Sequence, residues 1–235
     1  MFSGEVWNVF LMFLCYAYVL FTIFVSGKVD RFLHVSRKAS RKFLHVMIGN
    51  LPFVIPFFTS NVYPVLVATP FIVVTFLVSP YSPFLGIRRK LTGLASLTEE
   101  GHHLGLVFYA VSYTVLALVF ASKPYVIAAG ILPMAYGDAA ASLAGQRWGR
   151  RKYKVFASKS LEGSVAMFFV SFSSFTVGLA FFSTLYSFSA FDRLFAVLAT
   201  AAVATLFEGV SPLGFDNIIV PGSSALTFLA LGGGV

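Results

Sequence analysis

Charged residues and cysteine are scarce in this sequence. Only 11% of its 235 residues are charged and one, Cys15, is a cysteine, whereas 58% are hydrophobic and 28 are phenylalanine. A single cysteine excludes an intramolecular disulfide. Mean hydropathy is +0.86, and the apolar residues come in long runs without the spacing of an amphipathic helix. These features exclude an ordinary soluble domain and indicate a polytopic integral membrane protein.

Apolar runs of membrane-crossing length occur along the whole chain, given that a helix needs about 20 such residues to cross a bilayer. The second and third runs are short and rich in proline, so we expect tilted, kinked or re-entrant segments there. No Lys or Arg precedes the first run, so we expect no cleaved signal peptide. We predict an all-α fold, a single transmembrane domain over residues 1–235, with about eight transmembrane helices at 5–26, 43–58, 62–79, 104–121, 124–145, 163–185, 190–208 and 217–234.

Basic residues mark alternate loops. All but two of the 17 Lys and Arg residues follow the first, third and fifth runs, and only Lys123 and Arg193 lie in the other loops. By the positive-inside rule, this asymmetry predicts cytoplasmic basic loops and external termini. Basic residues that flank spans and contact anionic headgroups also account for the net charge of +8, which removes the main support for nucleic-acid binding.

Most acidic residues and histidines fall on the same predicted cytoplasmic side. Ionisable groups near a membrane are costly unless they are paired, metal-bound or hydrated, so we expect them to form one polar site at the cytoplasmic face. A transporter would place such groups near the midplane between repeated halves, and the sequence shows no internal repeat. The residues concerned are His45, Glu99, Glu100, His102, His103, Asp138, Glu162, Glu208 and Asp216.

A basic segment leads into the second run. Arg37, Arg41 and His45 recur at every fourth position, which places them on one helical face. With Lys42 beside it, this face is a candidate phosphate-binding surface, but the same spacing fits an interfacial helix that anchors the span. His45 is either a functional group or a residue that satisfies a neighbour such as Asn50.

The loop after the third run contains Glu100, His102 and His103 between two glycines. Their spacing matches none of the usual zinc patterns. Contact with magnesium or substrate phosphate is one interpretation, and hydrogen bonding to the neighbouring basic loops is the other.

Asp138 lies within an apolar run, and two sequence features of this run can accommodate a charged residue. Pro133 removes a helical hydrogen bond just ahead of the acid. Gly137, Ala141 and Gly145 form a small-residue ridge that lets another helix pack closely. Asp138 and Ser142 share the helical face next to this ridge, and Asp138 is therefore a candidate functional acid. A buried structural aspartate paired with a basic side chain is the alternative.

The segment SKSLEG, residues 158–163, opens the sixth run. A helix N-terminus with Lys159 between Ser158 and Ser160 is suited to bind phosphate, although a lysine anchor followed by a serine N-cap gives the same pattern. There is no GxxxxGK[ST] motif, so any nucleotide is bound by another design.

Two further acidic positions lie at the end of the seventh run and shortly after it. Glu208 closes the run, and Asp216–Asn217 precedes Pro221. An acid followed by an amide suits magnesium coordination, while a turn and helix start is the competing explanation.

These motifs together resemble the CTP-dependent polyprenol kinases, the group that contains dolichol kinase, phytol kinase and the CTP-using diacylglycerol kinase of fungi. The nucleotide signature of that family runs D-x2-A-x3-G-x3-G-x8-K-K-T-x-E-G. Serines replace its first lysine, at Ser158, and its threonine, at Ser160. The resemblance extends to Arg41–His45, Glu100–Gly105, Glu208 and Asp216–Pro221. The matching signature residues are Asp138, Ala141, Gly145, Gly149, Lys159, Glu162 and Gly163.

The resemblance implies transfer of the γ-phosphoryl group of CTP to the hydroxyl of a membrane isoprenoid alcohol of the dolichol, phytol or geranylgeraniol type, with Mg²⁺ or another divalent cation. Asp138 and Asp216 are expected to hold the metal–nucleotide complex, supported by Asn217 and Glu208. Lys159 is expected to bind phosphate, and Glu162 or His45 to act as base. The remaining expected nucleotide contacts are Ser142, Gly145, Gly149, Ser158, Ser160 and Gly163.

Phosphatidate cytidylyltransferases are similar in the central stretch and are the alternative family. Their terminal HGG and DRxD signature is missing, and GFDNIIVP, residues 214–221, is similar to the kinases instead. A non-enzymatic transporter is the second alternative. From size and resemblance, we expect a prokaryotic or archaeal membrane protein whose partners are CTP, the lipid alcohol and the bilayer. The sequence does not predict the alcohol or the oligomeric state.

Overall fold

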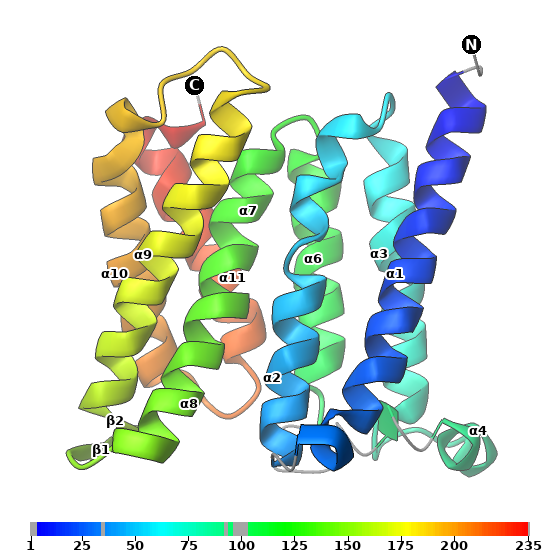
Figure 1. Cartoon of the computed structure of the whole chain (residues 1–235), viewed down its shortest axis with the longest axis vertical. Helices are drawn as coiled ribbons and strands as arrows, with labels where there is room; N and C mark the ends of the chain where they lie inside the picture. The colour runs from blue at the N-terminus through cyan, green and yellow to red at the C-terminus, as the bar shows by residue number, and fades with distance from the viewer. Residues whose placement is uncertain (1–3, 34–35, 92–93, 96–102, 235) are drawn as a thin grey trace.

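The fold is a bundle of long helices that run side by side (Figure 1). The computed structural model describes residues 4–33, 36–91, 94–95 and 103–234. The chain begins and ends at the same end of the bundle. The other end carries the start of α2, the short helix α4 and a β-hairpin, and is called the basic end below.

The helices are α1 (Gly4–Leu33), α2 (Arg37–Ile48), α3 (Val62–Val78), α4 (Leu85–Lys90), α6 (Gly105–Phe120), α7 (Pro124–Leu132), α8 (Asp138–Trp148), α9 (Leu161–Ser183), α10 (Leu194–Val210) and α11 (Asp216–Phe228). Short 3-10 turns occupy Leu51–Phe53, Ile55–Phe57 and Phe191–Arg193, and π-helical turns occupy Pro133–Gly137 and Leu229–Gly233. The strands β1 (Lys152–Lys154) and β2 (Ser158–Ser160) pair antiparallel.

Helices occupy the apolar runs that the sequence predicts to cross a membrane. The second run is the most irregular, because α2 ends before Gly49 and the proline-containing turns Leu51–Phe53 and Ile55–Phe57 follow. In the described chain, four helical segments are long and apolar enough to span a bilayer: Gly4–Lys28, Pro124–Trp148, Leu161–Ser183 and Phe191–Val210. The protein is thus mostly helical and fits a membrane protein, and the eight crossings stay a prediction.

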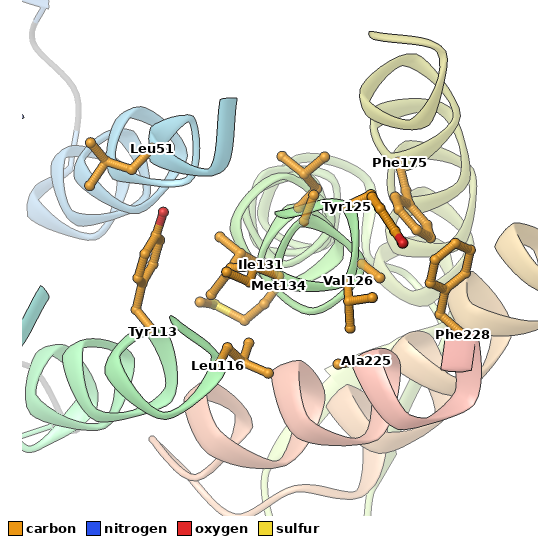
Figure 2. Packing of buried hydrophobic residues seen from close by; sticks show 14 of the residues in the cluster. Leu51, Tyr113, Leu116, Tyr125, Val126, Ile131, Met134, Phe175, Ala225 and Phe228 are labelled. Carbon is orange, nitrogen blue, oxygen red and sulfur yellow. The ribbon is translucent and has the colours of Figure 1, made fainter. Parts of the chain in front are cut away.

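The continuous rod from α7 to α8 forms the centre of the bundle. In its most apolar stretch 78% of the residues are buried, against 28%, 33% and 39% in the other three candidate spans. Figure 2 shows Ile131 and Met134 on this rod, with Leu116 of α6, Phe175 of α9 and other side chains packed around it. Because the rod is buried among the other helices, its packing fixes the position of the polar residues that it carries.

The prediction that Pro133 loosens this rod is confirmed. Residues Pro133–Gly137 form a π-helical turn directly before Asp138, as expected where proline cannot donate its helical hydrogen bond. The predicted small-residue ridge lies against α9: a Cβ added to Gly163 would lie 2.9 Å from the carbonyl oxygen of Ala141. Close approach of α8 and α9 therefore depends on the absence of a side chain there.

The hairpin is the one departure from the all-α prediction in the described residues. We expected residues 158–163 to form a turn into a helix, but Ser158–Ser160 is a strand whose Lys159 pairs in register with Tyr153. The tyrosine hydroxyl lies 2.7 Å from the Ser164 hydroxyl of α9, which fixes the hairpin to the bundle.

Candidate active site

A polar cavity of about 310 Å³ lies at the basic end of the bundle. Segments far apart in the sequence form its walls: α2, α8, the hairpin, the start of α9, and the chain on either side of the α10–α11 connection. The lining residues are Lys38, Arg41, Lys42, Asp138, Ala141, Ser142, Gly145, Gln146, Lys152, Ala157, Ser158, Lys159, Ser160, Gly163, Ser164, Glu208, Leu213 and Asp216.

Helix α2 supplies three cations to the cavity. Ser36 caps the helix by accepting a hydrogen bond from the Ala39 amide, which fixes the first turn. Lys38, Arg41 and Lys42 then line the cavity, at spacings of three and four residues that share one helical face. Burial and the neighbouring Lys42 and Arg41 charges lower the pKa of Lys38. The part of the cavity wall that α2 forms therefore carries an excess of positive charge.

Asp138 projects from the start of α8 into this basic surface. It is 6% exposed and forms a buried ion pair with Lys42. The alternative interpretation, an aspartate paired with a basic side chain, therefore describes the contact that is present. Because both residues also line the cavity, an anionic ligand could compete for Lys42 and leave the carboxylate free to bind a cation.

Lys159 reaches the cavity from β2 and forms an ion pair with Glu208 at the end of α10. Burial alone lowers the pKa of Lys159, but the Glu208 charge and two further carboxylates outweigh burial and hold that pKa above its ordinary value. The ammonium group is therefore positively charged at any physiological pH. Among the described cations of the hairpin, Lys159 is the only one that forms an ion pair with a buried carboxylate.

Ser160 closes the hairpin and begins α9. Its hydroxyl oxygen accepts a hydrogen bond from the Gly163 amide at 3.1 Å, so it is the helix N-cap that the sequence offered as an alternative. The hydroxyl hydrogen is still available to a ligand, since the cap uses an oxygen lone pair. Ser158 and Ser160 both line the cavity.

The glycines of the signature have a packing role. A Cβ on Gly145 would lie 3.0 Å from the Ser160 hydroxyl oxygen, and one on Gly149 would lie 2.9 Å from the same atom. Side chains there would push the hairpin away from α8. Gly145 and Gly163 also line the cavity, whereas Gly149 does not.

A second acidic position lies where α11 begins. Asp216 is 5% exposed and lines the cavity. Its Oδ1 accepts hydrogen bonds from the Asn217 backbone amide at 2.9 Å and side-chain amide at 3.0 Å. The Asn217 Oδ1 atom is buried without a hydrogen-bond partner. Asp138 and Asp216 also lie close enough for their charges to act on each other.

These carboxylates fit a divalent cation that is shared with a ligand. In the described part of the chain, no three acidic, histidine or cysteine side chains cluster tightly enough to hold a metal by themselves. Mg²⁺ is commonly held by one or two carboxylates together with substrate phosphates and water. Asp138 and Asp216 suit that arrangement, with the unpartnered Asn217 oxygen beside them.

Several predicted site residues lie outside the cavity lining. The Glu162 carboxylate accepts the Arg151 amide at 3.1 Å and stabilises the hairpin. His45 is buried and stacks on Tyr109, with ring centroids 4.8 Å apart. Of the loop cluster, His103 contacts Tyr81, while Glu100 and His102 lie outside the described residues. The side chain of Arg37 is likewise not described.

Sequence reasoning missed six lining residues. Lys38 lies four residues before Lys42 and Gln146 four residues after Ser142, so helical spacing could have indicated both. Gln146 donates to the Ser142 hydroxyl at 3.1 Å. The others depend on the hairpin or on chain reversals that no local pattern signals. The six are Lys38, Gln146, Lys152, Ala157, Ser164 and Leu213.

The charges of the cavity favour a polyanionic ligand. Five lining cations face three lining carboxylates, so the wall has a positive excess. A phosphate chain with a divalent cation would match both kinds of charge.

Comparison with known proteins gives relatives of one kind. Over 142 residues, 58% of this chain, the sequence is 42% identical to a phytol kinase of Synechocystis sp.. Over 202 residues, 81% of the chain, it is 27% identical to a probable chloroplastic phytol kinase 2 of rice. The matches span 59% and 65% of the length of those two proteins. No family model and no solved structure matches. The chain thus spans less than two thirds of the length of either relative, and both relatives are named as phytol kinases.

Proposed function

We propose that the protein is a lipid kinase that transfers the γ-phosphoryl group of CTP to the hydroxyl of a membrane isoprenoid alcohol. The observation that carries the proposal is the cavity, where signature residues Asp138 and Lys159 meet Lys42, Glu208 and Asp216 from three other segments. The phytol kinase relatives support an isoprenoid alcohol as acceptor. The signature that is similar to the CTP-dependent kinases supports CTP as donor.

Phosphoryl transfer requires positioning and charge stabilisation more than covalent chemistry. In the proposed reaction the alcohol oxygen forms a bond to the γ-phosphorus, the bond from that phosphorus to the bridging oxygen breaks, and CDP leaves. Lys159 and Lys42 hold phosphate oxygens, and Arg41 adds a third cation beside Lys42 on α2. Their positive charges stabilise the negative charge that develops on the leaving diphosphate.

The acidic residues would hold the metal–nucleotide complex. Asp138 and Asp216 are the proposed ligands, while Glu208 holds Lys159 in place and the Asn217 amide group orients Asp216. A bound Mg²⁺ would neutralise the phosphate charges.

His45 is the better of the two expected bases. The Glu162 carboxylate already accepts a hydrogen bond from the Arg151 amide of the hairpin. His45 lies one helical turn after Arg41 and Lys42, which line the cavity. An imidazole has a proton affinity suited to accept the alcohol proton near neutral pH.

The nucleotide product discriminates between the kinase and its alternatives. Purified protein given CTP and a panel of lipid alcohols should release CDP and form the lipid monophosphate. Release of pyrophosphate with a CDP-linked lipid would instead establish a cytidylyltransferase. If no nucleotide raises the thermal stability of the protein, a transporter or scaffold is favoured, because a ligand that binds only the folded state must stabilise it.

The membrane arrangement is part of the proposal. Both chain ends lie opposite the basic end (Figure 1), as an even number of crossings requires. With the positive-inside rule, this supports a multi-pass protein whose site faces the cytoplasm. A cysteine introduced at Phe156, on the exposed hairpin tip, should react with an impermeant reagent only in inside-out vesicles.

A further inference from the structure

An apolar cavity of about 50 Å³ lies between α1, α2, α3 and α6, away from the polar site. Its wall includes Val19 of α1, Leu44 and Ile48 of α2, Phe71 of α3 and Tyr113 of α6. On α6 the lining runs from Leu106 to Tyr113, which corresponds to about 10 Å along the helix at 1.5 Å per residue. The cavity is therefore a narrow slot parallel to the helices.

The slot and the polar cavity share helix α2. Arg41 and Lys42 line the polar cavity, and Leu44, two residues later, lines the slot. His45 lies between them: its ring stacks on Tyr109, a lining residue of the slot, and it follows Arg41, a lining residue of the polar cavity, by one helical turn. The two cavities therefore approach each other at His45.

The polar atoms along the slot are mostly satisfied by the protein. Thr75 donates to the Phe71 carbonyl at 2.6 Å, and Tyr109 donates to the His45 carbonyl at 3.2 Å. The Tyr113 hydroxyl is the exception, since it is buried without a hydrogen-bond partner. Figure 2 shows its ring extending from α6 toward Leu51, another lining residue. An unsatisfied buried hydroxyl is unfavourable, and because this one borders the slot it is available to a ligand bound there.

We propose that this slot binds the first isoprenoid segment of the lipid alcohol and places its hydroxyl at His45. The inference rests on the proposed kinase function. A slot of this volume holds only a few water-sized volumes, at roughly 15 Å³ each, so it takes a short branched segment while the remaining chain lies in the bilayer. The π face of an isoprenoid double bond can accept the Tyr113 hydroxyl weakly, which a saturated straight chain cannot do.

Filling the slot tests the proposal by kinetics. Ala110 and Ala68 line it from α6 and α3, so Ala110→Leu and Ala68→Leu should each raise KM for the isoprenoid alcohol about tenfold, equivalent to 1.4 kcal/mol. KM for CTP should change less than about twofold, since CTP binds elsewhere. Val115→Phe, which enlarges an exposed residue of the same helix, is the matched control and should leave both constants unchanged. Unchanged alcohol KM in both folded slot variants, judged by thermal stability, would overturn the proposal.

A binding experiment without CTP separates this proposal from the proposed function. A photoactivatable isoprenoid alcohol should crosslink to slot residues of the wild-type protein, and Ala110→Leu should reduce the yield several-fold while Val115→Phe does not. A protein that shows this pattern but forms no lipid phosphate would refute the kinase and retain the slot. Crosslinks that map elsewhere on an active kinase would refute the slot alone.

Tyr113→Phe provides a finer test. Without ligand the variant should be as stable as the wild type or more so, because no hydrogen bond is lost. It should weaken crosslinking of an unsaturated isoprenoid alcohol about twofold and leave its saturated analogue unaffected. If each alcohol crosslinks with the same yield to the wild type and to Tyr113→Phe, the Tyr113 hydroxyl does not contact the isoprenoid chain.

Discussion

Cations occur at both ends of the bundle, but they have different partners. At the end with the chain termini, Lys123 donates to the Gly234 carbonyl at 2.5 Å and Arg193 to the Gly233 carbonyl at 2.8 Å. Arg193 also lies 3.9 Å from the centre of the Phe188 ring. These contacts cap the last turn of the chain, where unpaired carbonyls attract positive charge.

At the basic end, Lys42 and Lys159 instead pair with the buried carboxylates of Asp138 and Glu208 around a cavity. Taking charges out of water costs free energy that an ion pair recovers only in part. Buried pairs beside a cavity are therefore poor stabilisers and suitable ligand sites. The comparison predicts that substitutions at the basic end change catalysis, and that those at the opposite end change stability alone.

Asp138→Asn should have the largest effect. The amide keeps the shape of the carboxylate but loses the charge that we assign to the metal–nucleotide complex, so kcat should fall about a hundredfold to a thousandfold, as when one transition-state contact is removed. Steady-state assays with CTP and an isoprenoid alcohol measure it. Near-normal turnover in a folded Asp138→Asn protein would show that Asp138 serves the fold and not catalysis.

Lys159→Met should reduce kcat/KM for CTP by a similar order, but it also leaves Glu208 without its partner, which can cost about 3–5 kcal/mol of stability. The double variant Lys159→Met/Glu208→Gln separates these effects, because it removes both charges. It should recover thermal stability without activity. Lys123→Met at the opposite end is the matched control and should retain full activity. A fully active double variant would show that Lys159 serves the fold alone.

Gly163→Ala should impair both stability and activity to an intermediate degree. Its new Cβ would lie 2.9 Å from the Ala141 carbonyl, so α9 must move from α8 at a cost of about 1–3 kcal/mol. Gly222→Ala is the control, since nothing lies within 4 Å of the added atom and alanine is favoured over glycine in a helix by about 0.5–1 kcal/mol. Thermal denaturation of both variants tests the contrast, and equal melting temperatures would contradict it.

Arg193→Ala should lower stability by about 1 kcal/mol, through loss of its hydrogen bond and ring contact. KM and kcat at permissive temperature should not change. A selective loss of kcat would mean that the end with the termini also serves catalysis, and the contrast between the ends would fail.

Lys38 should give the smallest effect, visible in the pH profile. Because its pKa is lowered from 10.5, Lys38 loses its proton earlier than an ordinary lysine as pH rises. CTP affinity that depends on this charge should be complete at neutral pH and decline on the alkaline side. Lys38→Arg should retain affinity to higher pH than the wild type. If KM for CTP depends on pH in the same way in the wild type and in Lys38→Arg, Lys38 is excluded as a phosphate contact.

Much of the helical framework follows from the sequence because apolar runs and proline act locally. The break after α2 and the π turn at Pro133–Gly137 both lie where prolines predict irregularity. Charge sorting also places Asp138, Lys159, Glu208 and Asp216 on one side, since each lies in the cytoplasmic part of a predicted span or beside a cytoplasmic loop, and the structure brings all four to one cavity.

What sequence reasoning could not supply is pairing between distant segments. Lys42 and Asp138 are 96 positions apart, and no local pattern indicates that they form an ion pair. The hairpin was missed because Lys152–Lys154 and Ser158–Ser160 are short and polar, and such strands carry no hydrophobic alternation. The position of His45 between two cavities depends on how α2 packs, which helical periodicity alone does not determine.

Transfer of label from γ-phosphate-labelled CTP to an isoprenoid alcohol, in membranes containing either the wild-type protein or Asp138→Asn, tests the central claim most directly. The proposed kinase function predicts labelled lipid monophosphate with the wild type and at least about a hundredfold less with the variant. Unlabelled lipid with the wild type, or equal labelling with both proteins, would contradict it.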